Sequence, residues 1–254
     1  MPSPLQLLHE SRQQAPNLRG RFVFLSASFP SFKRDGQFSG TADTAEISNA
    51  VVSLAKAVFQ ADGGLVFGGH PTITPLLLSV ARDLFLGQPS PLESRPRWTP
   101  DQGPRLLAYQ SHVYDRIRPP DIGELVGLRE GLGRIVETKI QNNERQPTTQ
   151  AEVNPRDQKF SLEHMRLRML MDPESRPVAA VFVGGMEGIH DEFQLAQSPA
   201  LRRYVIAAPG GAAARLAPVG PPDAPASLLH DLGTSRLYPH LAAQIVDDVV
   251  RHLG

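Results

Sequence analysis

The chain has 254 residues, of which 41% are hydrophobic, enough for one large domain or two small ones. Its 26 basic and 26 acidic residues give no net charge, which argues against a protein that grips nucleic acid through many phosphates. The absence of cysteine excludes disulfides, thiolate metal sites, iron–sulfur clusters and a cysteine nucleophile.

The N-terminal segment shows no long apolar run after a basic start, so we do not expect it to be a secretory signal. No stretch approaches the ~20 apolar residues that a membrane-spanning helix needs. We therefore expect a soluble, cytoplasmic protein without membrane contact. We treat residues 1–254 as a single domain with an N-terminal extension at 1–20.

The first half of the chain alternates short apolar runs with helical patterns. RFVFLSAS, residues 21–28, predicts a buried strand. Apolar residues at helical spacing follow from Ile47 to Val58, with Asp43 as a cap and Glu46 completing a capping box. Further strands are predicted at 65–69 and 105–109, with a helix within 71–87 between them.

The second half begins with an irregular excursion at 110–160, in which PPDIGELVGLREGLG indicates a short helix and RIVETKI a strand. Ser161 is the predicted cap of the next helix. The C-terminal segment 237–254 has the spacing of an amphipathic helix. Between these come a helix at 161–171, a strand at 178–185, a helix at 188–196, and a strand, two glycines and a helix start within 202–217.

Alternation of strands and helices predicts an α/β fold, a Rossmann-like doubly wound, mostly parallel sheet with helices on both faces. The apolar strands agree, because such a sheet is covered on both faces. Ligands of this architecture bind beyond the carboxyl ends of the strands, where strand order reverses.

Two glycine pairs stand at predicted strand ends, Gly68-Gly69 and Gly184-Gly185. Glycine there lets the backbone approach a ligand closely, and the following helix presents unpaired N–H groups and the positive end of its dipole. A tight turn that a doubly wound fold needs in any case is the alternative. Neither pair belongs to a GxGxxG or GxxxxGK[ST] motif, which disfavours an ordinary dehydrogenase or a P-loop nucleotide triphosphatase.

These segments resemble the SLOG superfamily, the Rossmann-like domains related to the "lonely guy" (LOG) phosphoribohydrolases and the DNA-processing protein Smf. FLSAS, LVFGGHPTITPLL, HMRLRM and VGGMEGIHDE occur in the family's order. Arg168 lies sixteen residues before Gly184, and Glu192 lies four after Gly188, as in the LOG pattern.

The sequence also departs from the LOG pattern. Ile189 replaces its threonine, Met169 the lysine after the arginine, and His70 the third glycine of the upstream loop. The resemblance is closer to divergent SLOG groups that accompany TIR-type effectors in prokaryotic conflict systems. It implies sensing or processing of a nucleotide-derived ligand.

The resemblance implies a catalytic pair, Arg168 and Glu192. An arginine can hold a phosphate through two hydrogen bonds, and the glutamate can position water or stabilise positive charge on a ribose. A solvated helix face and a favourable helix dipole are the alternatives. No metal site or resident cofactor is predicted, because the histidines lack a ligand spacing. The predicted ligand-binding residues are Ser26, Ser28, Gly68, Gly69, His70, Thr72, Gln110, Arg166, Gly184, Gly185, Met186, Glu187 and Gly188.

The leading hypothesis is a sensor that binds a nucleotide or NAD-derived metabolite, such as an ADP-ribose relative, in prokaryotic defence or nucleotide signalling. We expect a homo-oligomer that acts on a separate effector protein. One alternative is an N-glycosidase that cleaves the base–ribose bond of a nucleotide. The other is a protein-interaction module whose glycines are vestigial.

Overall fold

The computed structural model describes residues 17–87, 98–114, 116, 120–128, 131–138, 147–198, 201–216 and 219–253. Most of the predicted extension 1–20 and of the proline-rich stretch 88–104 lies outside these residues. Within them, no helix combines the length and the apolar character that crossing a bilayer requires.

A six-stranded, all-parallel sheet forms the centre of the molecule, with strand order β4-β3-β2-β1-β5-β6. The strands after β1 are added on one side of it as far as β4, and β5 and β6 are added on its other side, so the strand order reverses at β1. This arrangement confirms the predicted Rossmann-like α/β fold with its parallel sheet. The strands are β1 Phe22–Ser28, β2 Gly64–Gly68, β3 Leu106–Ser111, β4 Gly133–Thr138, β5 Pro177–Gly184 and β6 Arg202–Ile206.

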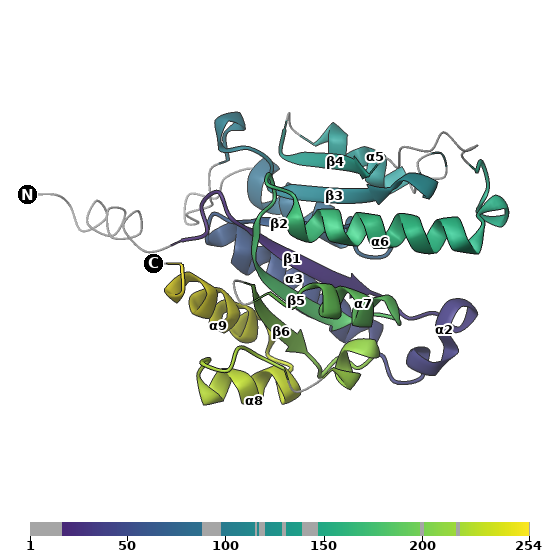
Figure 1. The fold of residues 1–254 in the computed structure, drawn as a ribbon. Helices are drawn as coiled ribbons and strands as arrows, with labels where there is room; N and C mark the ends of the chain where they lie inside the picture. The colour runs from purple at the N-terminus through teal and green to yellow at the C-terminus, as the bar shows by residue number, and fades with distance from the viewer. Residues whose placement is uncertain are drawn as a thin grey trace, which may run out of the picture.

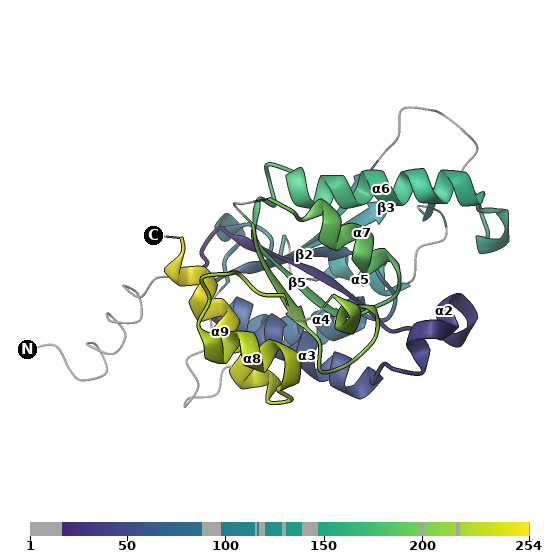
Figure 2. The same ribbon diagram turned by 60° about the horizontal axis from the view of Figure 1, so that its bottom comes forward.

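Helices cover both faces of the sheet and give three layers (Figures 1 and 2). The helices α3, α4, α8 and α9 lie on one face, and α6 and α7 lie on the other. The helices are α2 Phe32–Ser39, α3 Thr44–Gln60, α4 Thr74–Ala81, α5 Pro120–Gly127, α6 Pro155–Met171, α7 Gly188–Leu195, α8 Ala226–Thr234 and α9 Tyr238–Arg251.

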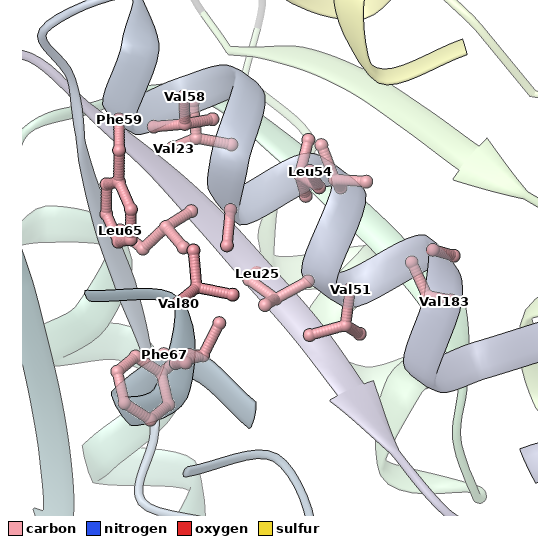
Figure 3. Close-up of a cluster of buried hydrophobic side chains, with 14 of the residues drawn as sticks. Val23, Leu25, Val51, Leu54, Val58, Phe59, Leu65, Phe67, Val80 and Val183 are labelled. Carbon is pink, nitrogen blue, oxygen red and sulfur yellow. The ribbon is translucent and has the colours of Figure 1, made fainter. Parts of the chain in front are cut away.

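The hydrophobic core is split by the sheet because successive side chains of a strand point to opposite faces. Val23 and Leu25 of β1 pack with α3, which buries Val51, Leu54 and Val58 (Figure 3). The intervening residues of β1 pack in a second cluster that includes side chains of α6 and α7. The apolar strands are thus buried on both sides, as the sequence predicts.

Several element boundaries differ from the sequence prediction. The helix α6 begins at Pro155 with Asn154 as its cap, not at Ser161, because the Asn154 side chain accepts the Arg156 N–H at 2.9 Å. Ser161 lies within α6 and its side chain is buried. The helices α2 and α8 were not predicted, and β6 is followed only by a 3-10 turn at Ala212–Arg215.

The predicted excursion 110–160 contains regular structure. The indicated short helix is α5, and the indicated strand is β4, which pairs in parallel with β3. Asp43 caps α3 as predicted, accepting the N–H groups of Ala45 and Glu46. The predicted capping box does not form: the Asp43 N–H donates to the Pro209 carbonyl at 2.9 Å, and the Glu46 carboxylate lies 3.9 Å from Arg236.

Candidate functional site

A pocket of about 320 Å³ opens at the carboxyl ends of β1, β2 and β3, between α6 and the start of α7. The strand arrows in Figure 1 point toward this edge, beside which α2 projects. The position agrees with the rule for doubly wound sheets, since it adjoins β1, where strand order reverses. Of the predicted residues, Ser26, Ser28, Gly68, Gly69 and His70 line it from β1, β2 and the loop that follows.

The other predicted residues that line the pocket come from β3, α6 and the β5–α7 junction. They are Gln110, Arg166, Met186, Gly188 and Glu192. Five predicted residues do not line it: Thr72, Arg168, Gly184, Gly185 and Glu187.

A mostly buried carboxylate, that of Glu192, occupies the α7 side of the pocket. Ser26 Oγ donates a hydrogen bond to Glu192 Oε2, and Arg166 Nε lies 3.3 Å from Glu192 Oε1. The Glu192 and Arg166 side chains are 16% and 12% exposed. Three segments that are far apart in the sequence therefore meet here: β1 contributes Ser26, α6 contributes Arg166 and α7 contributes Glu192.

The protonation of Glu192 is set by opposing effects. Burial raises the pKa of its carboxyl group, while the charge of Arg166 and the hydrogen bonds from Ser26 and Arg166 lower it; the net direction is upward. A carboxyl group with a raised pKa inside a pocket is suited to hold or transfer a proton.

Gly188 makes room for the guanidinium of Arg166. A Cβ atom on Gly188 would stand 2.4 Å from Arg166 Nη2, which is closer than any non-bonded contact allows. The same guanidinium donates from Nη1 to Asp191 Oδ2 at 2.9 Å. The first two turns of α7 thus hold Arg166 through one small residue, Gly188, and two carboxylates, Asp191 and Glu192.

The loop after β2 satisfies its own backbone donors. The Gly69 N–H donates to the Tyr109 carbonyl at 3.0 Å, and the His70 N–H to the Gly68 carbonyl at 2.6 Å. His70 Nδ1 lies 2.9 Å from Thr72 Oγ1, which orients the imidazole. Gly69 and His70 therefore shape the pocket wall without presenting these amides to a ligand.

The pair Gly184-Gly185 forms a tight turn. Both residues have positive φ, +61° and +76°, and both are buried. A Cβ on Gly185 would stand 2.1 Å from Ile189 Cδ1, and the Gly185 N–H donates to the Ser28 carbonyl at 2.8 Å. Glycine is needed here for backbone conformation and packing, which is the alternative that the sequence left open.

Arg168 lies on another side of α6 from the pocket. Its side chain is 53% exposed, and its Nη2 is 3.0 Å from Asp172 Oδ2 one helical turn away. Glu187 is exposed immediately before α7. Of the two arginines in HMRLRM, the structure thus brings Arg166 to Glu192 and pairs the half-exposed Arg168 with the buried Asp172.

The opposite end of the pocket contains residues that the predicted set omits. Gln158 Nε2 donates to the Tyr114 hydroxyl, and both side chains line the pocket. Ser111, also at the wall, shares a 2.7 Å hydrogen bond with Ser161. A correct start for α6 at Pro155 would have revealed Gln158 and Ser161, since both then fall in its first two turns.

Metal ligands do not gather in the described part of the chain: no three histidine, aspartate or glutamate side chains come together there. His190 and Asp191 are adjacent in sequence, yet Asp191 is engaged with Arg166.

One protein-family profile matches most of the chain. The profile of the SLOG cluster3 family matches residues 37–90 and 137–241, which include the loop after β2, α6, β5 and α7. The chain belongs to the SLOG cluster3 family. A search of curated proteins found no match.

Membership of the SLOG family suggests a nucleotide-related function. The matched segments of this SLOG protein contain Gly68, Arg166, Gly188 and Glu192, whereas β1 and β3 lie outside them. The pocket walls from the loop after β2, from α6 and from α7 are therefore shared with the family profile, and the walls from β1 and β3 come from segments that the profile does not match.

Proposed function

We propose that this SLOG cluster3 protein binds a nucleotide or an NAD-derived metabolite, such as an ADP-ribose relative, in the pocket at the carboxyl edge of its sheet. The observation that carries the proposal is the Glu192 carboxylate, fixed by Ser26 and Arg166 inside the pocket. In nucleotide-binding α/β folds, a carboxylate at this edge accepts hydrogen bonds from ribose hydroxyls.

The size of the pocket supports a small ligand. Small-molecule pockets fall at roughly 300–1,000 Å³. At about 320 Å³, this one is near the lower limit. It suits one nucleoside unit, and a longer metabolite would extend from the mouth into solvent.

The biological role that we propose is sensing, in prokaryotic defence or nucleotide signalling within the cytoplasm. The resemblance to SLOG groups that accompany effector domains supports this role. In it, the protein acts as a homo-oligomer and passes the signal to a separate effector protein.

Calorimetric titration tests the binding proposal, with AMP, ADP-ribose, NAD, cyclic ADP-ribose and cyclic dinucleotides as probes. We expect saturable binding of at least one probe, weakened at least tenfold in Glu192→Gln, because the charged acceptor for ribose is lost. Glu163→Gln, an exposed glutamate on α6, is the matched control. Absence of binding to every probe would reject the proposal and favour a protein-interaction module.

A second candidate function is N-glycoside hydrolysis, favoured by the raised pKa of Glu192 beside Arg166. In that reaction Glu192 orients a water and accepts the proton that the water releases as its oxygen bonds to C1′ of the ribose. The C1′–N bond breaks, the base leaves with its electron pair, and that proton passes to the base. Chromatography after incubation with the same probes detects free base, and Glu192→Gln should abolish its release. If every probe stays intact after long incubation, hydrolysis is rejected and only the binding function remains.

A further inference from the structure

The charges at the pocket do not form a ready phosphate site. Among the described residues that line it, Arg166 is the sole arginine or lysine. Its guanidinium is already paired with Asp191 and Glu192, at 2.9 and 3.3 Å. A phosphate would have to displace at least one carboxylate, and the three charges sum to at most zero when Glu192 is protonated.

Backbone donors offer little more. The Gly69 and His70 amides after β2 and the Gly185 amide after β5 each donate to a backbone carbonyl. The start of α7 remains, since Met186 and Gly188 line the pocket. The dipole at an accessible helix start changes the affinity for one negative charge by at most about fivefold.

A neutral acceptor, in contrast, is unsatisfied. Gln110 lines the pocket at the end of β3 and is 4% exposed. Its Oε1 has no hydrogen-bond partner among the described residues. A Cβ on Gly69 would stand 2.9 Å from this oxygen and 2.8 Å from Ile122 Cδ1, so glycine at this position is what leaves room for the Gln110 carboxamide. Buried polar atoms without partners are uncommon and call for an explanation, which a ligand N–H supplies.

The two ends of the pocket are separated by the width of the sheet between them. Ser26 is on β1 and donates to Glu192 of α7, and Gln110 is on β3, two strands away. Neighbouring strands are ~4.8 Å apart, so β1 and β3 are roughly 10 Å apart, and alternation along the strands places Ser26 on the α6–α7 face and Gln110 on the α3–α4 face. This distance is comparable to that between the ribose hydroxyls and the far edge of the base in a nucleoside.

We propose that the pocket selects the neutral nucleoside part of its ligand, with Gln110 hydrogen-bonding an adenine-like edge and any phosphates directed to solvent. The inference rests on the proposed function and adds which part of the ligand the pocket recognises, namely the nucleoside. A glutamine carboxamide pairs with adenine through one donor and one acceptor, N6–H and N7, whereas hypoxanthine presents O6 in place of the amino group.

Calorimetry with adenosine, AMP, ADP-ribose and inosine at 50 and 500 mM NaCl tests the inference. We expect adenosine, AMP and ADP-ribose to bind within about fivefold of one another and with little salt dependence, because few ion pairs form. Inosine should bind at least tenfold more weakly than adenosine. Gln110→Met, which keeps the bulk of the side chain, should remove that discrimination.

A charge variant provides a second test. Asp191→Asn removes one of the two negative charges that pair with the Arg166 guanidinium. The variant should therefore raise the affinity for AMP relative to adenosine by about three- to tenfold. Asp247→Asn, an exposed aspartate on α9, changes the net charge equally and should leave the ratio unchanged.

The outcomes separate this inference from the proposed function. AMP or ADP-ribose binding more than thirtyfold tighter than adenosine, with loss of binding in high salt, would overturn the inference and leave nucleotide binding intact. Equal binding of inosine and adenosine would overturn the role of Gln110. If no compound binds, both proposals fail.

Discussion

At the scale of single residues, the site depends on which side chains have room to approach one another. Arg166 reaches Glu192 because residue 188 is a glycine. Glu192 in turn is buried enough to raise its pKa despite the neighbouring cation. Both properties belong to α7, whose first turn holds the glycine and whose second holds the glutamate.

Gly188→Ala should weaken ligand binding with little loss of stability. The new Cβ would displace the Arg166 guanidinium and break at least one charge-assisted hydrogen bond, which costs roughly ten- to a hundredfold in affinity. Calorimetry and urea unfolding measure the two effects. Gly123→Ala in α5, where a Cβ meets nothing within 4 Å, is the control and should leave affinity unchanged. Equal affinity of Gly188→Ala and wild type would contradict the positioning of Arg166.

Glu192→Gln should change how stability depends on pH. Because the folded state raises the Glu192 pKa above 4.5, its ordinary value, the folded state holds a proton that the unfolded chain releases. Wild-type stability is therefore lost as pH rises from about 4.5 through the raised pKa, and the variant lacks this loss. The difference in melting temperature, variant minus wild type, should grow between pH 4.5 and 8. A constant difference, as expected for Glu163→Gln, would refute the raised pKa.

At the scale of elements, the β5–α7 junction shows why a glycine pair is not by itself a ligand loop. Positive φ at Gly184 and Gly185 turns the chain sharply, and the turn packs against Ile47 and Ile189. The Gly185 carbonyl also accepts the Ala212 N–H at 3.0 Å, which ties the turn to the segment after β6. The pair positions α7, and α7 contributes the residues at the pocket.

Gly185→Ala should destabilise the fold by about 2–5 kcal/mol, from a side chain in the left-handed region and from overpacking against Ile189. Urea denaturation gives the free energy of unfolding. Gly233→Ala in α8, where a Cβ meets nothing within 4 Å, is the matched substitution and should cost no stability. An unfolding midpoint that does not move in Gly185→Ala would show that the turn tolerates a side chain.

The docking of α9 on the sheet edge rests on a buried charge network. Asp248 is fully buried and accepts from Arg202 Nη2 and from the Tyr204 hydroxyl, both at 2.6 Å. Arg202 and Tyr204 belong to β6, so the network joins the C-terminal helix to the last strand. Burial raises the pKa of Tyr204, reinforced by its hydrogen bond to Asp248, which keeps its hydroxyl a donor.

Asp248→Asn should cost about 2–4 kcal/mol of stability, because it leaves Arg202 without its buried counter-charge. Thermal and urea unfolding measure the loss. The adjacent exposed residue supplies the control, since Asp247→Asn should change stability by less than about 0.5 kcal/mol. Similar effects of the two substitutions would mean that the network contributes no net stability.

At the scale of the whole molecule, the site exists because a parallel sheet collects strand ends at one edge. Ser26, Gly69, Gln110 and Glu192 span 167 positions of the sequence, counting both ends, yet line one pocket. The crossover from β4 back to β5 carries α6 across the sheet, and this places Arg166 over the strand ends. A ligand bound there contacts strands and helices at once.

A bound ligand should therefore stabilise the whole domain. At a free concentration 100 times its dissociation constant, it adds about 2.7 kcal/mol, provided that it does not bind the unfolded chain. For a domain of this size, the melting temperature should rise by roughly 5–11 °C. Differential scanning fluorimetry across a concentration series checks this, with Glu192→Gln expected to shift the series to higher concentration. A rise that saturates below 2 °C at full occupancy would indicate binding to the unfolded chain as well.

Sequence patterns predicted the parallel α/β fold and most strands because buried strands of such sheets are continuous apolar runs. They also predicted β4 and α5, although their surroundings are irregular. Helix starts were harder to predict from the sequence. Asn154 caps α6 and Pro155 begins it, but the first residues of this helix are mostly polar and show no helical spacing of apolar residues. The sequence did not show that Arg166 rather than Arg168 lines the pocket, because the two lie on opposite sides of the α6 face that buries Met165 and Met169.

By itself, the sequence determined the fold, the edge of the sheet where a site belongs and the glycines that its turns require. These follow from local periodicity and from backbone conformations that only certain residues adopt. Only the tertiary structure decided that Gly188 faces Arg166, that the Gly184-Gly185 turn is closed, and that Gln110 lies at the far wall. Those outcomes depend on how α6 and α7 are rotated against the sheet, which is fixed by packing between segments distant in the chain.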